Sequence, residues 1–488
     1  HGYKVWWGGK NDVVPGEHGF DAYCDVKYEP PPEELAKPAA RPENPDWRGD
    51  PGGDNYFSFH IGRLVGGDAL AGGTLSRDWA MTRGAVDLIR DYDGDEPLCI
   101  FLALGMPHPP YAAEEPWFSM IDRAKVPPRR PVPADRSLEP PMYQQMRDKL
   151  RMGGWSDERW QELRATYYAS CAQVDHQFGM VVDALKDAGI YDETAIFFFS
   201  DHGDLTGDYD VVQKADGLFP DSQTRVPFII KPPADVPTQP RVSEALVELV
   251  DFSATVEAVT GVGPYHDHFG RSLLPVIAGE TDEHRDAVFG EGGRRYGEIA
   301  HQSLELVDEP VEDGLYWPTL RLYRRDIPSI GRAVMLRTHD FKYVHHLYTT
   351  DELYDLREDA EEKVNRINDP AYGDVLRELR DRMLRFHLET SDVVPRTVNA
   401  REAGEAHLQR HGPDSTDAQF EEYLFLRPNV KGVHFERWRH AMGCGKWFLA
   451  ARDTATLEVF GTYSAQTTEP PREIVEAITK KHPDWSPA

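Results

Sequence analysis

The sequence lacks any apolar run near the roughly 18 residues needed to cross a bilayer. A membrane span is therefore not expected, and 40% hydrophobic residues with 11% aromatics indicate a soluble globular chain. Positive charge is also scarce, because 54 Lys and Arg face 83 Asp and Glu, a net charge of −29. Such a surface repels nucleic-acid phosphates, anionic membranes and highly sulfated polymers, so we expect none of these as partners.

Cysteine is equally sparse, with no Cys-x-x-Cys spacing among Cys24, Cys99, Cys171 and Cys444. Neither a disulfide framework nor a zinc cluster is indicated, and we expect buried thiols. The first residues, His1-Gly2-Tyr3, include no initiator methionine and no charged-then-apolar leader. We expect a start after processing or within a longer reading frame, and we favour the cytoplasm over secretion or the periplasm. A homo-oligomer is compatible with this composition.

Length and apolar patterning predict the fold. At 488 residues the chain exceeds one compact core, which predicts a large domain and a smaller one. Continuous apolar runs at 98–105, 195–200 and 226–230 are typical of strands buried on both faces. Helical spacing predicts helices at 160–188 and 242–260. This alternation predicts a layered α/β/α domain with a mostly parallel central sheet.

The later part of the chain is patterned differently. Residues 333–336 and 341–344 are strand-like and 372–388 helix-like, which indicates a smaller α+β domain. We therefore predict an α/β domain at 1–280, an α+β domain at 281–395, and an appended tail or subdomain at 396–488.

One segment places titratable side chains at the end of a predicted strand. The run Phe199-Ser-Asp-His-Gly-Asp-Leu-Thr-Gly207 puts Asp201 and His202 where the strand gives way to a glycine-containing loop. Ligand sites of α/β enzymes form at strand ends, and a carboxylate and an imidazole on adjacent residues can reach one divalent cation. For a bare Asp-His-Gly, however, a turn capped by Asp201 with a solvated His202 is the commoner arrangement.

The surrounding sequence resembles the sulfatase family of the alkaline phosphatase superfamily. Lys214 and the block Arg225-Val-Pro-Phe-Ile-Ile230 follow the Asp-His-Gly-Asp run. Gly9-Lys10 after Gly2-Tyr3 is similar to the family's Gly-Tyr and Gly-Lys block, and Met106-Pro-His-Pro-Pro-Tyr111 to its Pro-His-x-Pro loop. Further segments, at 168–185, 271–280 and 352–365, agree in order, so the resemblance spans roughly residues 1–395.

The resemblance implies hydrolysis of sulfate monoesters, of small molecules or saccharides, by a formylglycine nucleophile beside a divalent metal. Asp201 and His202 match the family's metal ligands, with calcium the family default and manganese or another transition metal the alternative. Lys10 and Lys214 match residues that hold the sulfuryl oxygens. His108 matches the acid that protonates the departing alkoxide, so all three are expected to bind substrate and act in catalysis.

The sequence also departs from the family pattern. Its Gly-Lys-x-His block reads Gly9-Lys10-Asn11-Asp12, so Asp12 replaces the histidine that helps the aldehyde hydrate collapse, unless His18 substitutes for it. No Cys-x-Pro-x-Arg or Cys-x-Ala-x-Arg motif occurs, and the early Asp-Asp pair is absent. Both normally precede the Gly-Tyr block. We therefore expect a sulfatase that lacks its amino-terminal segment and is inactive by itself.

Two other interpretations differ in class. The first is a phosphodiesterase or phosphonate monoester hydrolase of the same superfamily, since the scaffold also handles tetrahedral phosphorus. Lys10 and Lys214 favour sulfate over that alternative. The second is a non-catalytic remnant that binds ligands or partners without turnover.

Overall fold

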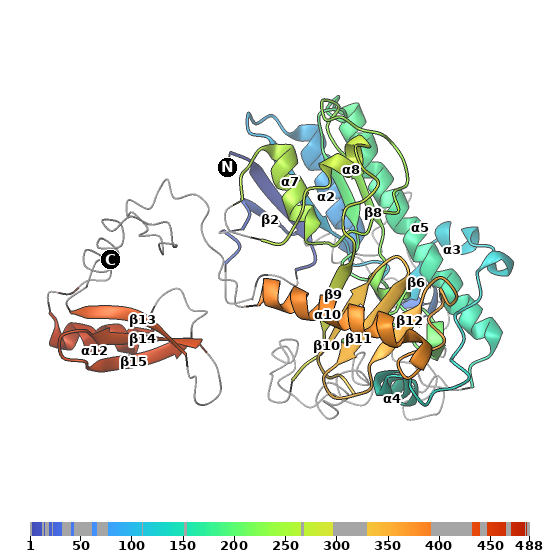
Figure 1. Ribbon diagram of the computed structural model, residues 1–488. Coiled ribbons are helices and arrows are strands. Elements are labelled where there is room, and N and C mark those ends of the chain that lie inside the picture. Colours follow the sequence, from blue (N-terminus) through green and yellow to red (C-terminus); the bar gives the residue numbers. More distant parts are fainter. Residues whose placement is uncertain are drawn as a thin grey trace. The chain divides into compact units, whose positions relative to one another are not determined.

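Figure 1 shows the computed structural model of the chain. It describes residues 2–11, 14, 19–21, 23–31, 41–42, 61–65, 77–109, 111–150, 154–264, 268–295, 329–391, 432–439, 447–464, 470–483 and 485. The predictions for Asp12, His18 and Cys444 lie outside these residues. The chain separates into two compact units, His1–Val398 and Asn399–Ala488. The boundaries drawn from the sequence at 280 and 395 remain predictions.

The first unit contains a small parallel sheet with aligned strand ends. Strand β1 (Lys4–Gly9) lies between β2 (Val26–Tyr28) and β5 (Leu98–Ala103), parallel to both. Because Gly9 pairs with Ala103, the carboxyl ends of β1 and β5 lie side by side. A separate three-stranded sheet has the order β3-β4-β6, formed by β3 (Arg41–Pro42), β4 (Ile61–Val65) and β6 (Tyr111–Ala113), with β4 antiparallel to β3 and parallel to β6.

Strand β7 (Ile196–Phe199), which pairs antiparallel with β8 (Phe228–Lys231), is covered by helices on both faces. On one face, Phe178 of α5 (Asp157–Asp187) lies 4.9 Å from Phe198 between ring centroids. On the other, Phe252 of α7 (Asp251–Thr260) contacts Phe197 and Phe199 at 5.2 and 5.0 Å. This packing confirms the predicted α/β/α layering, which Figure 1 also shows.

Helix α2 (Arg77–Asp91) packs beside α5. Val86 and Ile89 of α2 meet Ala184 and Leu185 of α5 in one apolar cluster. Helix α5 begins after Ser156, whose side chain accepts a hydrogen bond from the amide of Arg159. Two acidic residues in the first turn further stabilise this end of the helix. The remaining short elements are α3 (Trp117–Met120), η2 (Arg123–Lys125), α4 (Pro141–Leu150), η3 (Asp208–Asp210), α6 (Asp221–Thr224), α8 (Leu274–Ala278) and η5 (Pro370–Tyr372).

The helix predicted at 242–260 is wrong in its first half, since α7 begins only at Asp251. The backbone before Asp251 makes hydrogen bonds outside a helix. Leu246 forms a β-bridge with Arg285, and the amide of Glu248 donates to the Asp251 carboxylate at 3.0 Å. These contacts compete with the hydrogen bonds of a helical turn.

A four-stranded antiparallel sheet follows, in the order β12-β11-β10-β9. Its strands are β9 (Val288–Gly292), β10 (Ala333–Arg337), β11 (Phe341–His346) and β12 (Glu352–Asp355). Helix α10 (Gly373–Thr390) packs Leu379 and Met383 against Leu336, Tyr343 and Leu353 of this sheet. The strands at 333–336 and 341–344 and the helix at 372–388 are therefore confirmed.

The second unit has its own antiparallel sheet of β13 (Val433–Arg439), β14 (Trp447–Asp453) and β15 (Val459–Ser464). Helix α12 (Arg472–Lys481) packs Ile474 and Ile478 against Ala451 of this sheet. Among the described helices of both units, none combines the length and apolar character that crossing a bilayer requires. The expectation of buried thiols is wrong for Cys99, which is exposed on β5, whereas Cys24 is buried.

Candidate active site

Lys10 lies directly after the carboxyl end of β1. Its amide donates to the carbonyl of Ala103 at 2.8 Å, which fixes the turn against the end of β5. Gly9 makes this turn with φ at +96°, and a Cβ atom there would lie 1.9 Å from the same carbonyl oxygen. Only glycine fits both the backbone conformation and the close approach.

His108 lies on the loop that follows β5. The carboxylate of Asp78, on α2, accepts hydrogen bonds from the amides of Gly105 and Met106 at 2.8–3.0 Å and so anchors the loop to the helix. The His108 amide donates to Gly105 O at 3.0 Å. Its Nδ1 lies 2.7 Å from the carbonyl of Pro109. An Nδ1–H donor there leaves Nε2 as the ring nitrogen that can exchange a proton with a ligand.

Asp201 and His202 follow β7 directly. The next residue, Gly203, donates its amide to Gln223 O at 2.7 Å, and a Cβ at Gly203 would lie 2.1 Å from the carbonyl of Ser222. This contact explains why glycine completes the Asp-His-Gly run. His202 Nδ1 lies 2.8 Å from Gly203 O, while its Nε2 lies 2.5 Å from Lys214 Nζ and 3.5 Å from Asp201 Oδ2.

Several of the sequence-predicted residues lie near one another. Lys214 contacts His202 directly. Burial lowers the pKa of His108, and the nearby positive charges of Lys214 and Lys10, together with His202, lower it further. We refer to Lys10, His108, Asp201, His202 and Lys214 as the candidate cleft.

The metal-ligand prediction is compatible with the donor chemistry. Asp201 is 71% exposed, and its carboxylate lies close enough to His202 Nε2 for both to reach one cation. In the part of the chain that the structure describes, however, no group of three or more His, Cys, Asp or Glu side chains is placed to hold a metal ion. These two residues can contribute to a metal site but do not complete one.

Reasoning from sequence missed the residues that shape this cleft. Asp204 is half-buried, accepts hydrogen bonds from the Tyr111 hydroxyl at 3.0 Å and from the Thr206 amide at 2.7 Å, and has a pKa raised by burial. The Gln223 side chain binds the backbone of Ala215 on both its N–H and its carbonyl, at 2.9 and 3.0 Å, and so supports the loop that carries Lys214. Asp204 was visible in the Asp-His-Gly-Asp run, whereas Gln223 and Asp78 gave no sequence signal.

Comparison with known proteins agrees with this geometry. Residues 1–262 match the sequence model of the sulfatase family. A multifunctional alkaline phosphatase superfamily protein of Trinickia caryophylli is 26% identical over 325 residues, covering 64% of this chain and 59% of the relative. Arylsulfatase K of Danio rerio is 30% identical over 230 residues, covering 43% of this chain and 42% of the relative. The chain thus spans about half the length of these curated relatives.

Solved structures share the fold. A phosphonate monoester hydrolase of Agrobacterium radiobacter has a TM-score of 0.60 at 22% identity, covering 81% of this chain and 79% of that one. A sulfatase from Bacteroides thetaiotaomicron, described as putative, has a TM-score of 0.51 at 19% identity, covering 81% and 75%.

The second unit is similar to a different family. Residues 399–465 match the sequence model of the sarcosine oxidase delta subunit family. The sulfatase match, by contrast, covers more than half of the 488 residues and contains all five candidate site residues. The chain belongs to the sulfatase family.

Proposed function

We propose that this chain provides the substrate-binding and acid-catalytic part of a hydrolase that cleaves sulfate monoesters. The observation that carries the proposal is the contact between Lys214 and His202, with both lysines close enough to His108 to lower its pKa. A sulfate ester carries its negative charge on the sulfuryl oxygens, which ammonium groups stabilise most strongly in a poorly solvated site.

Each residue has a distinct task in this proposal. Lys10 and Lys214 hold the sulfuryl group, and His108 gives a proton to the departing alkoxide. Burial and the nearby lysines lower the pKa of His108, which favours release of its proton. A bound sulfate monoester offsets the charges of the lysines, so it raises the pKa of His108 and restores the proton where the leaving group needs it.

The remaining parts are a metal ion and a nucleophile. Asp201 and His202 would hold a divalent cation, with calcium preferred for the carboxylate and manganese or another transition metal favoured by the imidazole. The cation would supply Lewis-acid polarisation of the sulfuryl oxygens. A formylglycine would be the nucleophile, and none of the four cysteines stands in a Cys-x-Pro-x-Arg or Cys-x-Ala-x-Arg motif. We therefore propose that the 488 residues alone turn over aryl sulfates at background rate.

Binding of inorganic sulfate tests the cleft without requiring turnover. We expect Lys214→Met to weaken sulfate binding about tenfold, since a hydrogen bond between charged groups is lost. Lys231→Met is the matched control, because Lys231 Nζ donates to the carbonyls of Tyr191, Asp192 and Thr194 and is not part of the cleft. Calorimetry showing equal sulfate affinity for both variants would contradict the assignment of Lys214.

Phosphonate monoester hydrolysis is the second candidate function. It is favoured by the fold likeness to a phosphonate monoester hydrolase at a TM-score of 0.60. An assay can distinguish sulfate from phosphonate ester hydrolysis. It compares an aryl sulfate with an aryl phosphonate monoester as substrates of a longer form of the protein that carries a nucleophile. A higher kcat/KM for the phosphonate ester would replace the first proposal with the second. Turnover of neither ester would favour the non-catalytic alternative.

A further inference from the structure

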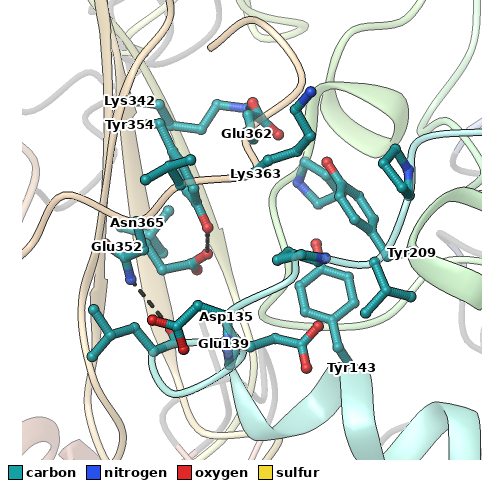
Figure 2. A pocket seen from close by; sticks show the side chains of 18 of the residues that line it. Asp135, Glu139, Tyr143, Tyr209, Lys342, Glu352, Tyr354, Glu362, Lys363 and Asn365 are labelled. Atoms are coloured by element: carbon teal, nitrogen blue, oxygen red, sulfur yellow. Dashed lines mark hydrogen bonds and ion pairs between the residues drawn. The ribbon is translucent and has the colours of Figure 1, made fainter.

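A second cavity lies within the first unit, between the proline-rich segment at 131–140 and the antiparallel sheet (Figure 2). Its volume of about 610 Å³ falls in the range of small-molecule sites. The walls are largely apolar, with several prolines on one side and Val344 of β11 on the other. The cleft residues Lys10, His108, Asp201, His202 and Lys214 are not among those that line it.

Tyrosines and glutamates converge inside this cavity. Figure 2 shows Tyr143 rising from α4 beside Tyr209, with Glu352 and Tyr354 on the strand opposite. The rings of Tyr143 and Tyr209 lie 5.2 Å apart between centroids. Burial, then Tyr209, then the charges of Glu352, Glu362 and Glu139, raise the pKa of Tyr143 well above its usual range. The Tyr143 hydroxyl therefore stays neutral within a ring of carboxylates.

Lys342 also lines the cavity, and its positive charge is neutralised by acidic side chains. Its ammonium group donates to the carbonyl of Phe219 at 2.9 Å and to Asp221 at 2.5 Å, and it pairs with Glu362. The Glu352 carboxylate contacts His346 Nε2 at 2.7 Å and accepts a hydrogen bond from the Tyr354 hydroxyl at 2.6 Å. Among the ionisable side chains that line the cavity, four are acidic, namely Asp135, Glu139, Glu352 and Glu362, and two are basic, namely Lys342 and Lys363, of which Lys363 pairs with Glu361.

Two polar groups of the lining lack partners among the described residues. Tyr143 is only 7% exposed, and no described group hydrogen-bonds to its hydroxyl. Glu139 pairs with Arg147 through one carboxylate oxygen, while the other, Oε1, is buried without a hydrogen bond. An unpaired buried carboxylate oxygen is costly, so Glu139 Oε1 together with the Tyr143 hydroxyl in the lining indicates a place for a ligand's hydrogen-bond donors.

We propose that this cavity binds an organic ammonium cation that carries N–H donors. Its nitrogen would lie among Glu139, Glu352 and the Tyr143 hydroxyl, where carboxylates accept hydrogen bonds and phenol rings attract a cation. Its hydrocarbon part would contact the proline-rich wall and Val344.

Ligand-observed NMR titrations of the 488-residue chain test the proposal with three probes. Cyclohexylammonium chloride should bind at least tenfold more tightly than cyclohexanol, because the two share a ring and differ in charge. Tetramethylammonium, which has no N–H donor, should bind more weakly than cyclohexylammonium. Equal affinity for cyclohexanol would reduce the site to an apolar cavity. Displacement of the amine by calcium chloride beyond the effect of sodium chloride at equal ionic strength would overturn the proposal in favour of a metal ion.

Matched variants locate the binding. Tyr143→Phe should weaken cyclohexylammonium binding about tenfold, and Ala134→Trp, at the exposed rim of the cavity, should weaken it at least as much by filling the space. Tyr92→Phe is the control, since that hydroxyl donates to Glu96 O on the surface. Thermal unfolding of each variant checks that it is folded. Unchanged affinity in folded Tyr143→Phe and Ala134→Trp would overturn the proposal.

Discussion

Glu114 is a buried carboxyl group whose protonation should set part of the pH dependence of stability. It follows β6, is 1% exposed, and accepts from Trp79 Nε1 at 3.2 Å and Gln173 Nε2 at 3.4 Å. Neutral donors do not compensate for the lost hydration of a carboxylate, and burial raises its pKa from 4.5 to about 7. The folded chain therefore holds a proton at this site that the unfolded chain has released.

The sign and size of the effect follow from that difference. Below pH 4.5 Glu114 is protonated in both the folded and the unfolded chain, so its burial does not lower the free energy of unfolding by way of ionisation. As the pH rises from 4.5 to about 7, the unfolded state loses its proton first, so stability falls, and above pH 7 the penalty is constant. A shift of about 2.5 pKa units corresponds to roughly 3 kcal/mol.

The substitution Glu114→Gln removes the ionisation and keeps an oxygen that can accept from Trp79. Allowing about 1 kcal/mol for altered hydrogen bonds, we expect the variant to be roughly 2 kcal/mol more stable than the parent at pH 8. At pH 4.5 it should be equal or slightly less stable. Urea unfolding followed by fluorescence at several pH values measures both differences.

Glu115→Gln is the control with the opposite sign. Glu115 is partly exposed, and hydrogen bonds from Ser119 and the charge of Arg63 outweigh its burial and lower its pKa. Relative to the parent, its neutral variant should lose stability as the pH rises from the lowered folded pKa to 4.5, and the difference should stay constant at higher pH. A Glu114→Gln difference that does not change between pH 4.5 and 8 would refute the reasoning, because it would mean that Glu114 ionises at the same pH in the folded and unfolded states.

Three further predictions concern the candidate active site. Gly9→Ala should destabilise the first unit by about 2 kcal/mol or more, because its Cβ would lie 1.9 Å from Ala103 O, whereas Gly19→Ala, with no atom within 4 Å, should change the melting temperature little. Asp78→Asn should speed hydrogen exchange of the two amides that it holds in the loop before His108, and unchanged exchange would contradict the anchoring role. In a catalytically complete form of the protein, kcat/KM should fall as the pH rises through the lowered pKa of His108. The fall in kcat should come at higher pH, because a bound sulfate ester raises that pKa. Identical pH profiles of kcat and kcat/KM would contradict the role of His108 as the acid.

The regular elements could be predicted because they depend on local pattern. Apolar runs located β5, β7 and β8, and helical spacing located α5 and α10 within a few residues. The start of α7 could not be predicted in this way, because a bridge to Arg285 and the Asp251 side chain redirect the backbone before it. The exposure of Cys99 was equally hidden, since burial on both faces depends on what covers the strand.

The candidate site is only partly readable for a related reason. The motifs supplied Lys10, His108, His202 and Lys214, but which of them lie close together depends on the fold. The paired ends of β1 and β5 precede Lys10 and the His108 loop, and Lys214 contacts His202. The residues that hold these loops are distant in sequence, with Asp78 lying 27 residues before the amide of Gly105 that it binds.

The net charge of the chain is likewise a poor guide to the charges around the candidate cleft. A net charge of −29 describes the whole chain and predicts repulsion of an anionic substrate, yet the cleft gathers two lysines around His108. At physiological salt the Debye length is about 8 Å, so exposed charges farther than that from the cleft act weakly on a bound sulfate. Lys214 is half-buried and Lys10 is exposed, and both are close enough to His108 for their charges to lower its pKa. Net charge therefore limits which large polyanions can approach the surface, while the groups within the cleft decide whether a small sulfate ester binds.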